Sequence, residues 1–157
     1  MKKFLLILLT LFVLPLAVFA DEKQEALEFF NSYVEGANSY SPTIAEMYSP
    51  NAKIIRQVVK PDGTTVNVYT NTATYVKQMK IGQAGAKLRK YKNNYSNITV
   101  TPVENGFKVS SLRQPSGETY KLKAYMVVQK QASGKWLIVE ELMQTKEQIF
   151  LRYADKN

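Results

Sequence analysis

The sequence predicts an α+β domain in which three helices from the N-terminal half pack on a strongly curved antiparallel sheet. Three observations support this. Apolar residues recur at helical spacing early in the chain, they alternate with period two from about residue 88 to 145, and short turn sequences separate the later segments. Such a sheet cannot bury its face alone, so the helices should cover one side of it. A curved sheet wrapped around helices forms a cone with an open end, a natural cavity for a small molecule.

Three segments have helical character. Residues 23–37 place Tyr33 on an apolar stripe at helical spacing. A shorter helix follows, with Ser41 as its N-cap and a proline at its first position. The third helix is capped by Asn71 or Thr72 and its last turns are weakened by glycines.

Six segments have the alternation and composition typical of strands. They cover residues 53–60, 64–69, 88–103, 107–114, 119–130 and 135–145. Short turn sequences with glycine join consecutive strands as hairpins. The predicted order is therefore helix, helix, hairpin, helix, and then four antiparallel strands.

The first 20 residues have the layout of a secretory signal peptide. Lys2 and Lys3 precede an apolar run at residues 4–13, and compact residues occupy the −3 and −1 positions of a cleavage site after Ala20. The apolar run is shorter than the roughly 20 residues of a spanning helix, so we expect cleavage and no stable membrane anchor. The expected location is the periplasm or the outside of the cell.

The expected organisation is a signal peptide at residues 1–20, one folded domain at 21–145 and a C-terminal tail at 146–157. The chain contains no cysteine, so its fold depends on packing without disulfides. It contains no histidine either, which removes the commonest general acid or base and the commonest neutral metal ligand. We expect no metal site and no cofactor.

The chain is basic, with 21 Lys and Arg residues against 13 Asp and Glu residues and a formal net charge of +8. Much of the excess lies in six residues near the middle of the chain, namely Lys77, Lys80, Lys87, Arg89, Lys90 and Lys92. A basic stripe interleaved with tyrosines can bind nucleic acid or an anionic membrane surface. An exported protein rarely meets nucleic acid, so we expect no nucleic acid partner and a solvated basic face. Lipid head groups or anionic envelope polymers are the alternative partners.

Two segments resemble the nuclear transport factor 2-like superfamily, which includes ketosteroid isomerase, scytalone dehydratase and the polyketide cyclases. Ala45-Glu46-Met47-Tyr48-Ser49-Pro50-Asn51-Ala52 is similar to its helix-to-strand turn, and Gly134-Lys135-Trp136-Leu137-Ile138-Val139 is similar to its final strand. The resemblance implies the cone-shaped α+β fold for the whole mature chain. It does not choose a function, because the superfamily contains enzymes, binding domains and assembly subunits.

The isomerase branch offers a test by residue. Its chemistry needs a tyrosine donor on the first helix, a carboxylate base on the first strand and a carboxylic acid on a later strand. In this sequence the corresponding positions are Tyr33, Arg56 and Met126. A guanidinium cannot accept a proton at neutral pH and a thioether cannot donate a hydrogen bond, so we reject isomerase chemistry and expect no catalytic residue.

Six residues are predicted to line a ligand site inside the cone. They are Tyr33, Arg56, Tyr120, Met126, Trp136 and Glu140. Period-two alternation places Glu140 on the same side of the last strand as Trp136. A buried charge needs a partner, so one account is an Arg56–Glu140 ion pair. The other account is that Arg56 binds an anionic ligand. Under the first account, Arg56→Met destabilises the fold; under the second, the variant is stable and loses binding.

The outer side of the last strands is too apolar for a fully solvated face and predicts a homodimer interface. Its residues are Tyr125, Val127, Leu137, Val139 and Met143. Members of the resembling superfamily often dimerise through this surface. Three functions stay open: an exported non-catalytic domain that binds a small or amphipathic ligand, a structural or interaction subunit of a cell-envelope assembly, and a lyase or isomerase with an atypical base.

Overall fold

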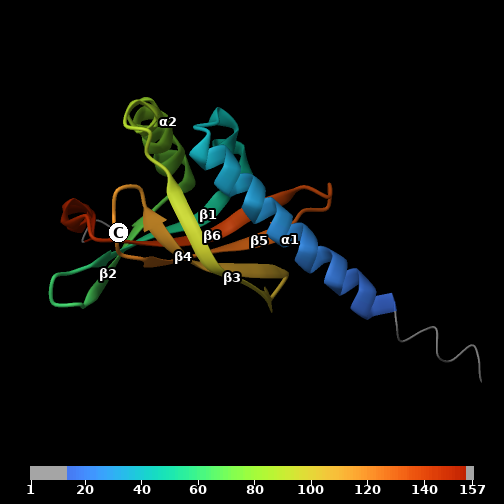
Figure 1. Ribbon diagram of the computed structural model, residues 1–157. Helices are drawn as coiled ribbons and strands as arrows, with labels where there is room; N and C mark the ends of the chain where they lie inside the picture. The colour runs from blue at the N-terminus through green and yellow to red at the C-terminus, as the bar shows by residue number, and fades with distance from the viewer. Residues whose placement is uncertain (1–13, 155–157) are drawn as a thin grey trace, which may run out of the picture.

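Alternating apolar residues build a six-stranded sheet, and the helices lie on one of its faces (Figure 1). The computed structural model describes residues 14–154, and the side chains from Val18 onward. In chain order the elements are α1 (Leu14–Asn38), the 3₁₀ helix η1 (Pro42–Met47), β1 (Tyr48–Val59), β2 (Thr65–Thr70), α2 (Thr72–Leu88), β3 (Asn93–Val103), β4 (Gly106–Pro115), β5 (Leu122–Lys130), β6 (Trp136–Thr145) and the 3₁₀ helix η2 (Gln148–Tyr153). The predicted α+β class and element order are confirmed.

The strand order across the sheet is β2-β1-β6-β5-β4-β3. The neighbours joined by hairpins are antiparallel, as predicted, but β1 and β6 pair in parallel. No tight turn joins these two strands, so nothing forces them to run in opposite directions. The sheet is strongly curved and does not close into a barrel (Figure 1).

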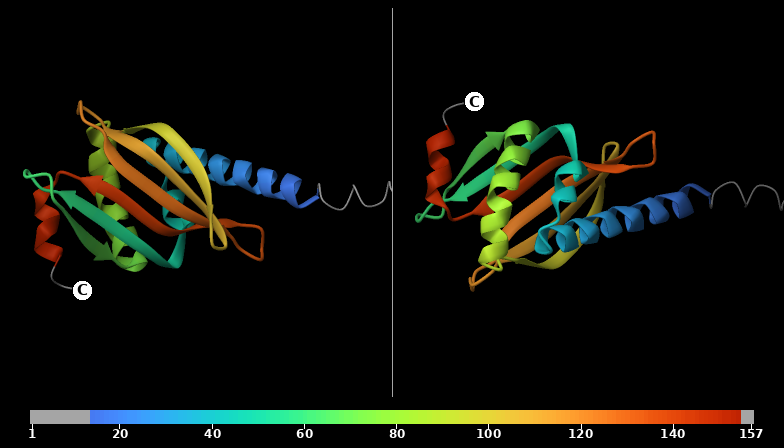
Figure 2. Two further views of the ribbon diagram at one scale, coloured as in Figure 1. Left: turned by 90° about the horizontal axis from the view of Figure 1, so that it is seen from below. Right: turned by 90° about the horizontal axis from the view of Figure 1, so that it is seen from above.

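The helices cover only one face of the sheet. Seen from above, α1 and α2 cross in front of the strands; seen from below, the opposite face of the sheet has no helix on it (Figure 2). The core lies between these layers, where Phe30 and Tyr33 of α1 pack against Phe107, Met126 and Ile138 of the sheet. This is the arrangement expected for a sheet with one apolar face.

Polar side chains fix the ends of the helices. The Ser41 hydroxyl caps η1 by accepting from the Thr43 amide at 3.3 Å, as predicted. Asn71 rather than Thr72 caps α2, since its side chain accepts from the Thr74 amide at 2.8 Å. Local sequence therefore sets where η1 and α2 begin.

Several element boundaries differ from the prediction. α1 begins at Leu14 rather than at residue 23, and it continues through Ala20. Residues 1–13 of the predicted signal peptide lie outside the described part, and cleavage stays a prediction. β3 begins at Asn93 rather than at residue 88, after a turn in which Lys90 has a φ of 52°. Between residues 14 and 154, no helix combines the length and the apolar character needed to cross a membrane.

The predicted C-terminal tail forms a defined element. The 3₁₀ helix η2 packs beside β1 and β2, which are far away in sequence (Figure 1). Gln148 anchors its start by donating to the Val59 carbonyl at 2.9 Å. This contact places Phe150 and Tyr153 where they line a cavity together with residues of β2 and α2.

Candidate functional site

A β-bulge in β6 decides which of its carboxylates faces the helices. Ile138 pairs with Val128 and Glu140 pairs with the adjacent Val127, so Val139 is an extra residue in β6. One extra residue moves every later side chain to the other face of a strand. Glu141 therefore points to the helices and is 0% exposed, while Glu140 points away from them.

The buried carboxylate is the centre of a polar cluster. One oxygen of Glu141 accepts from Arg56 Nη1 at 2.8 Å and from the Tyr75 hydroxyl at 3.4 Å. The other oxygen accepts from the hydroxyls of Tyr48 and Tyr33, the latter at 3.4 Å. Arg56 Nη2 also donates to the Tyr75 hydroxyl at 2.6 Å. We call these five residues the Glu141 cluster.

Four different elements supply the Glu141 cluster. Tyr33 comes from α1, Tyr48 and Arg56 from β1, Tyr75 from α2 and Glu141 from β6. Arg56 lies 4.7 Å from the centre of the Tyr75 ring, so its cation also contacts an aromatic face. The cluster ties both long helices to the centre of the sheet.

Burial and the neighbouring charges keep the tyrosine hydroxyls and the Arg56 guanidinium of the cluster protonated. Burial raises the pKa of Tyr33 and of Tyr48 well above 10, and the negative charge of Glu141 raises both further. For Arg56, burial opposes the charged form, but the oxygens of Tyr75 and Glu141 outweigh it and raise its pKa above the ordinary value. The tyrosines therefore remain protonated donors, and Arg56 remains a cation.

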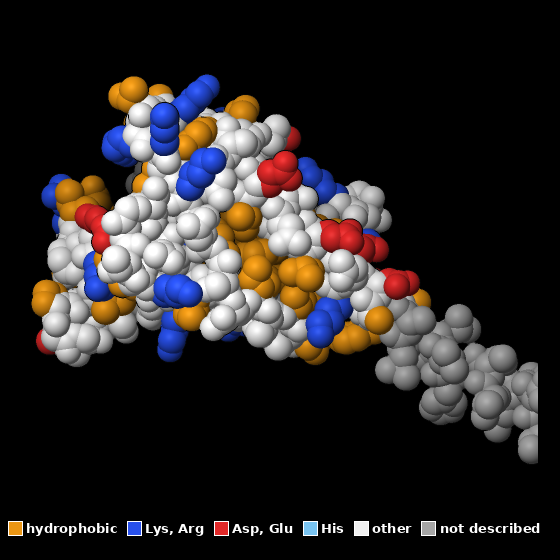
Figure 3. Space-filling model, viewed as in Figure 1, with side chains coloured by type: hydrophobic (Ala, Val, Ile, Leu, Met, Phe, Trp, Pro, Cys, Tyr) orange, Lys and Arg blue, Asp and Glu red, His pale blue; other side chains and the backbone are white. Residues whose placement is uncertain are grey.

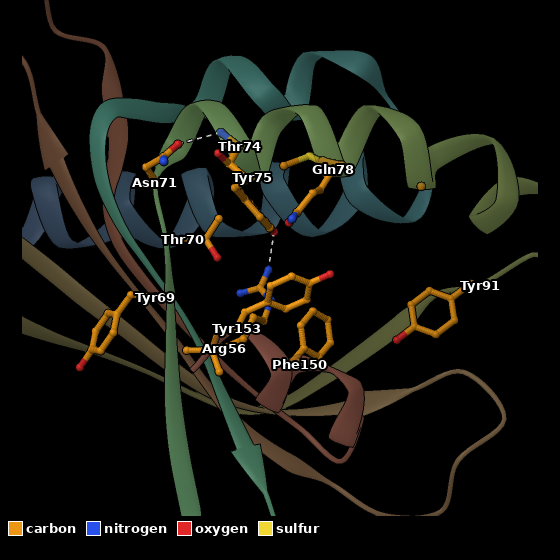
Figure 4. Close-up of a pocket in the computed structure, with 13 residues that line it drawn as sticks. Arg56, Tyr69, Thr70, Asn71, Thr74, Tyr75, Gln78, Tyr91, Phe150 and Tyr153 are labelled. Carbon is orange, nitrogen blue, oxygen red and sulfur yellow. Dashed lines mark hydrogen bonds between the residues drawn. The ribbon is translucent and has the colours of Figure 1, made fainter. Parts of the chain in front are cut away.

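A cavity of about 760 Å³ opens beside the cluster, between β2, α2 and η2 (Figure 4). Arg56 and Tyr75 form its inner wall, and Phe150 and Tyr153 approach from η2 on the side opposite α2 (Figure 4). The complete lining is Arg56, Val68, Tyr69, Thr70, Asn71, Thr74, Tyr75, Gln78, Met79, Gly82, Tyr91, Phe150 and Tyr153. It combines aromatic rings with hydroxyl and amide groups, and none of these residues is acidic.

A second cavity of about 260 Å³ lies between α1, η1 and α2. It shares Tyr75, Met79 and Gly82 with the larger cavity, so these residues of α2 form a wall between the two. Tyr33 and Tyr40 line the smaller cavity.

Of the six residues predicted to line a ligand site, Arg56 and Tyr33 belong to the Glu141 cluster and Met126 lies next to it. Arg56 lines the larger cavity and Tyr33 the smaller one. Met126 is buried directly opposite Glu141 on the neighbouring strand. Met126 occupies the position at which isomerase chemistry needs an acid, and the carboxylate of Glu141 lies next to it. That carboxylate forms an ion pair with Arg56.

The other three predicted residues lie elsewhere. Trp136 is at the opposite end of the helical layer, where its indole nitrogen donates to Glu25 at 2.9 Å. Tyr120 precedes β5, and the Lys146 ammonium lies 4.0 Å from its ring centre. Glu140 is on the outer face of the sheet. None of the three lines either cavity.

The predicted Arg56–Glu140 ion pair is wrong by one residue. Arg56 does have a buried acidic partner, but the partner is Glu141. Glu140 instead accepts from the Tyr125 hydroxyl at 2.5 Å and lies 3.7 Å from the Lys53 ammonium. The bulge at Val139 is the cause. Strict period-two alternation assumes that a strand has no extra residue, so it assigns every side chain after the bulge to the wrong face.

The same bulge corrects the predicted dimer surface. Met143 was expected on the outer face, but it packs against the core and pairs with Arg56 and Ala124 on the inner side. Leu142 takes the outward position, beside Tyr125.

The sequence prediction missed three kinds of site residue. Tyr48 and Tyr75, whose hydroxyls donate to the buried carboxylate, were not among the six predicted site residues, and neither was Glu141 itself. Phe150 and Tyr153 fell in the predicted tail. One signal was available in the sequence. Arg56 was expected to point inward and β6 contains two consecutive acids, Glu140 and Glu141, so a single bulge in β6 decides which of the two pairs with Arg56.

Solved structures supply the comparison, because no protein-family model and no curated protein matches the sequence. A nuclear transport factor 2-like protein of unknown function from Pseudomonas putida aligns with a TM-score of 0.62 at 12% identity over 80% of this chain and 87% of that chain. A nuclear transport factor 2-like protein with a cystatin-like fold from Novosphingobium aromaticivorans gives a TM-score of 0.60 at 11% identity over 86% and 88%.

A third similar structure is a ketosteroid isomerase-like protein from Shewanella frigidimarina, with a TM-score of 0.54 at 16% identity over 74% of this chain and 91% of that chain. The chain therefore has the nuclear transport factor 2-like fold, and the expected resemblance is confirmed at the level of fold. At these identities the likeness shows the fold alone and carries no residue roles.

Proposed function

We propose that this protein is an exported, non-catalytic domain that binds a small apolar or amphipathic ligand in its larger cavity. The observation that carries the proposal is the cavity of about 760 Å³ between β2, α2 and η2. Its size lies within the roughly 300–1,000 Å³ typical of small-molecule sites. Its aromatic rings favour a ligand with a flat or apolar body, and its hydroxyl and amide groups favour a few polar atoms.

The charge of the cavity wall favours a neutral ligand group at Arg56. The Arg56 side chain is 15% exposed, but its charge is balanced by the fully buried Glu141 at 2.8 Å. An anionic ligand would have to compete with that carboxylate for the guanidinium. A carbonyl or hydroxyl oxygen needs no such exchange, because a guanidinium carries five donor hydrogens.

Non-catalytic binding is supported by the state of the acidic group. A general base must be able to reach the proton that it removes. Glu141 has no exposed surface, and both of its oxygens accept bonds from the cluster. No carboxylate, histidine or cysteine is among the described residues that line the cavity.

Binding of a neutral apolar fluorophore, N-phenyl-1-naphthylamine, tests the cavity. We expect Phe150→Ala and Tyr153→Ala each to weaken dye binding by about three- to tenfold, because each removes an aromatic wall. Tyr120→Ala is the matched control and should leave binding unchanged, since Tyr120 lies outside the cavity. Equal effects of the three substitutions, or no binding by the unsubstituted protein, would reject the proposal.

Export is the part of the proposal that rests on the N-terminal sequence. Lys2, Lys3 and the apolar run at residues 4–13 support it. Among the described residues before the cut, Val18 is 56% exposed and Phe19 is 45% exposed, and the centre of the Phe19 ring lies 5.4 Å from the ring centre of the core residue Phe107. A cut after Ala20 would therefore remove this one aromatic contact with the core. Native mass spectrometry of the protein from its own host tests cleavage and reveals any retained ligand. An uncut chain in the cytoplasm would contradict export.

A homodimer or an envelope assembly is the second proposal, and the uncovered outer face of the sheet supports it (Figure 2). Tyr125, Val127, Leu137 and Val139 are only partly exposed side chains on an otherwise helix-free layer. We expect a dimer mass by static light scattering, and Val127→Lys should shift it to a monomer because it places a charge in an apolar interface. A monomer mass at micromolar concentration contradicts this proposal without affecting the cavity.

A further inference from the structure

The helix α2 has two apolar faces, and only one of them is used by the fold. Tyr75 and Met79 face the sheet and line the cavities. On the opposite side, Ile81 is 72% exposed and Leu88 is 86% exposed, the two most exposed large hydrophobic side chains among the described residues. They are seven positions apart, so they lie on the same line along the helix.

Basic side chains surround this exposed apolar line. Lys77, Lys80 and Lys87 belong to α2 itself, and Arg89 and Lys90 follow directly. All five residues are exposed. In the space-filling view, blue and orange side chains gather together over α2 (Figure 3). We call this surface, together with Ile81, Ala84 and Leu88, the basic face of α2.

The charge on the basic face is not balanced by acids of the same chain. No Asp or Glu occurs between Asp62 and Glu104. The ion pairs formed within residues 14–154 use other cations, namely Lys53, Arg56 and Lys130. A surface that only kept the protein soluble would need no exposed Ile and Leu at its centre.

We propose that the basic face of α2 docks the protein on an anionic lipid bilayer. A helix that lies in a membrane interface carries aliphatic side chains that enter the boundary and lysines that attract anionic head groups, which is the combination found here. Nucleic acid fits less well, because its single strands are held by aromatic stacking and this face presents aliphatic side chains. With two large aliphatic residues, the binding is weak and reversible.

Docking through this face leaves the cavity accessible. The cavity lies against the inner side of α2, and the basic face of α2 lies on its outer side. The helix therefore separates the cavity from the docking surface. The inference goes beyond the proposed ligand binding and does not depend on it.

A local fluorescent label tests the proposal. The chain has no cysteine, so Ala84→Cys labelled with an environment-sensitive nitrobenzoxadiazole places one reporter between Ile81 and Leu88. We expect its emission to brighten and move to shorter wavelength with vesicles of phosphatidylcholine and phosphatidylglycerol, but not with phosphatidylcholine alone. The same label at Ser133→Cys, in the β5–β6 turn far from α2, should not respond (Figures 1 and 2).

Matched variants separate the basic face from net charge. Lys77→Gln/Lys80→Gln/Lys87→Gln should weaken vesicle binding at least about tenfold. Exposed lysines elsewhere supply the control, Lys23→Gln/Lys123→Gln/Lys135→Gln, which changes the net charge equally and should leave binding within about twofold.

The apolar contribution is tested in the same way. We expect Ile81→Ser/Leu88→Ser to weaken vesicle binding about tenfold or more while leaving the fold intact, because both side chains are exposed. Ile149→Ser, at a residue that is 55% exposed in η2, is the control that should not change binding.

The full chain includes the apolar run at residues 4–13, which can itself enter a bilayer. Co-sedimentation of the full chain with vesicles would therefore not distinguish this run from the basic face. The label at residue 84 and the matched variants make that distinction. A silent label at residue 84 on anionic vesicles overturns the proposal. Equal losses in the two lysine triples also overturn it. The anionic polymer heparin gives a third outcome. If heparin competes for the basic face while the emission of the label shows no move to shorter wavelength with anionic vesicles, the face is a polymer site and the proposal is overturned.

Discussion

Glu140 and Glu141 are neighbours in β6, yet they occupy opposite faces of the sheet and very different environments. Glu140 faces outward, with a tyrosine hydroxyl at 2.5 Å and a lysine at 3.7 Å. Glu141 faces inward, bonded to an arginine at 2.8 Å and to tyrosine hydroxyls. The two carboxylates have the same kinds of partner, so they differ mainly in exposure, which is 30% for the Glu140 side chain and 0% for that of Glu141.

The difference in exposure decides how much each carboxylate contributes to the stability of the fold. A buried ion pair adds little over a well-packed apolar pair, but removal of one partner leaves a charge without water or a counterion. An exposed pair has water as a substitute for either partner. The same chemical change should therefore have a large effect on the inner face and a small one on the outer face.

The largest expected effect is that of Glu141→Gln. It preserves the size of the side chain but leaves Arg56 buried without its counterion, and we expect a loss of about 3–5 kcal/mol in the free energy of unfolding. Urea unfolding followed by circular dichroism measures it. Glu140→Gln is the matched control and should cost no more than about 1 kcal/mol.

A double variant shows whether the lost charge balance is the cause. Arg56→Met combined with Glu141→Gln removes both charges and keeps an amide oxygen at residue 141 that can accept from the tyrosine hydroxyls, so it should recover at least about half of the loss caused by Glu141→Gln alone. If Glu141→Gln and Glu140→Gln are equally mild, the buried cluster does not have the role assigned to it.

The second effect is a loss of stability at alkaline pH. The folded-state pKa of Tyr33 and of Tyr48 lies well above 10, mainly because of burial, whereas the unfolded chain has tyrosines near 10. The unfolded state therefore binds fewer protons above pH 10, and the stabilisation that is complete below pH 10 declines as the pH rises. Each tyrosine should contribute about 1.4 kcal/mol per pH unit to this decline. Unfolding curves from pH 9 to 12 measure it, and the slope should become shallower in Tyr48→Phe.

The sequence was sufficient for the fold because the fold depends on patterns that survive small shifts. Period-two alternation found the strands even where their starts were misplaced, as at residues 88–92. The apolar stripe with Phe30 and Tyr33 placed α1 against the sheet correctly. A capped segment with a few apolar residues was enough to find α2.

The site was less predictable because it depends on single residues. One extra residue at Val139 exchanged Glu140 for Glu141 and moved Met143 inward. Nothing in the local sequence marks such a bulge, since its stability comes from the neighbouring strands. Phe150 and Tyr153 reach the cavity only through the long-range contact of η2 with β1 and β2, which no periodicity reveals.

Removal of one tyrosine hydroxyl on each face gives the third comparison. The Tyr48 hydroxyl donates to the buried Glu141, and we expect Tyr48→Phe to cost about 1.5–3 kcal/mol, as for hydrogen bonds to charged groups. The Tyr125 hydroxyl donates to Glu140 on the outer face, where water can replace it, so Tyr125→Phe should cost less than about 1 kcal/mol. Thermal unfolding of the two variants side by side measures the difference, and a larger loss in Tyr125→Phe would reverse the comparison.

The smallest expected effect is that of Lys53→Gln, which removes the cation beside Glu140. The two side chains are 55% and 30% exposed and their charged atoms are 3.7 Å apart, so the pair should contribute at most about 1 kcal/mol. Because the Debye length falls to about 3 Å at 1 M salt, even this contribution should vanish there. Urea unfolding of Lys53→Gln at low and high salt measures it. A loss that persists at 1 M salt would mean that Lys53 acts through its packing on Tyr69, whose ring centre lies 5.6 Å from the ammonium, rather than through Glu140.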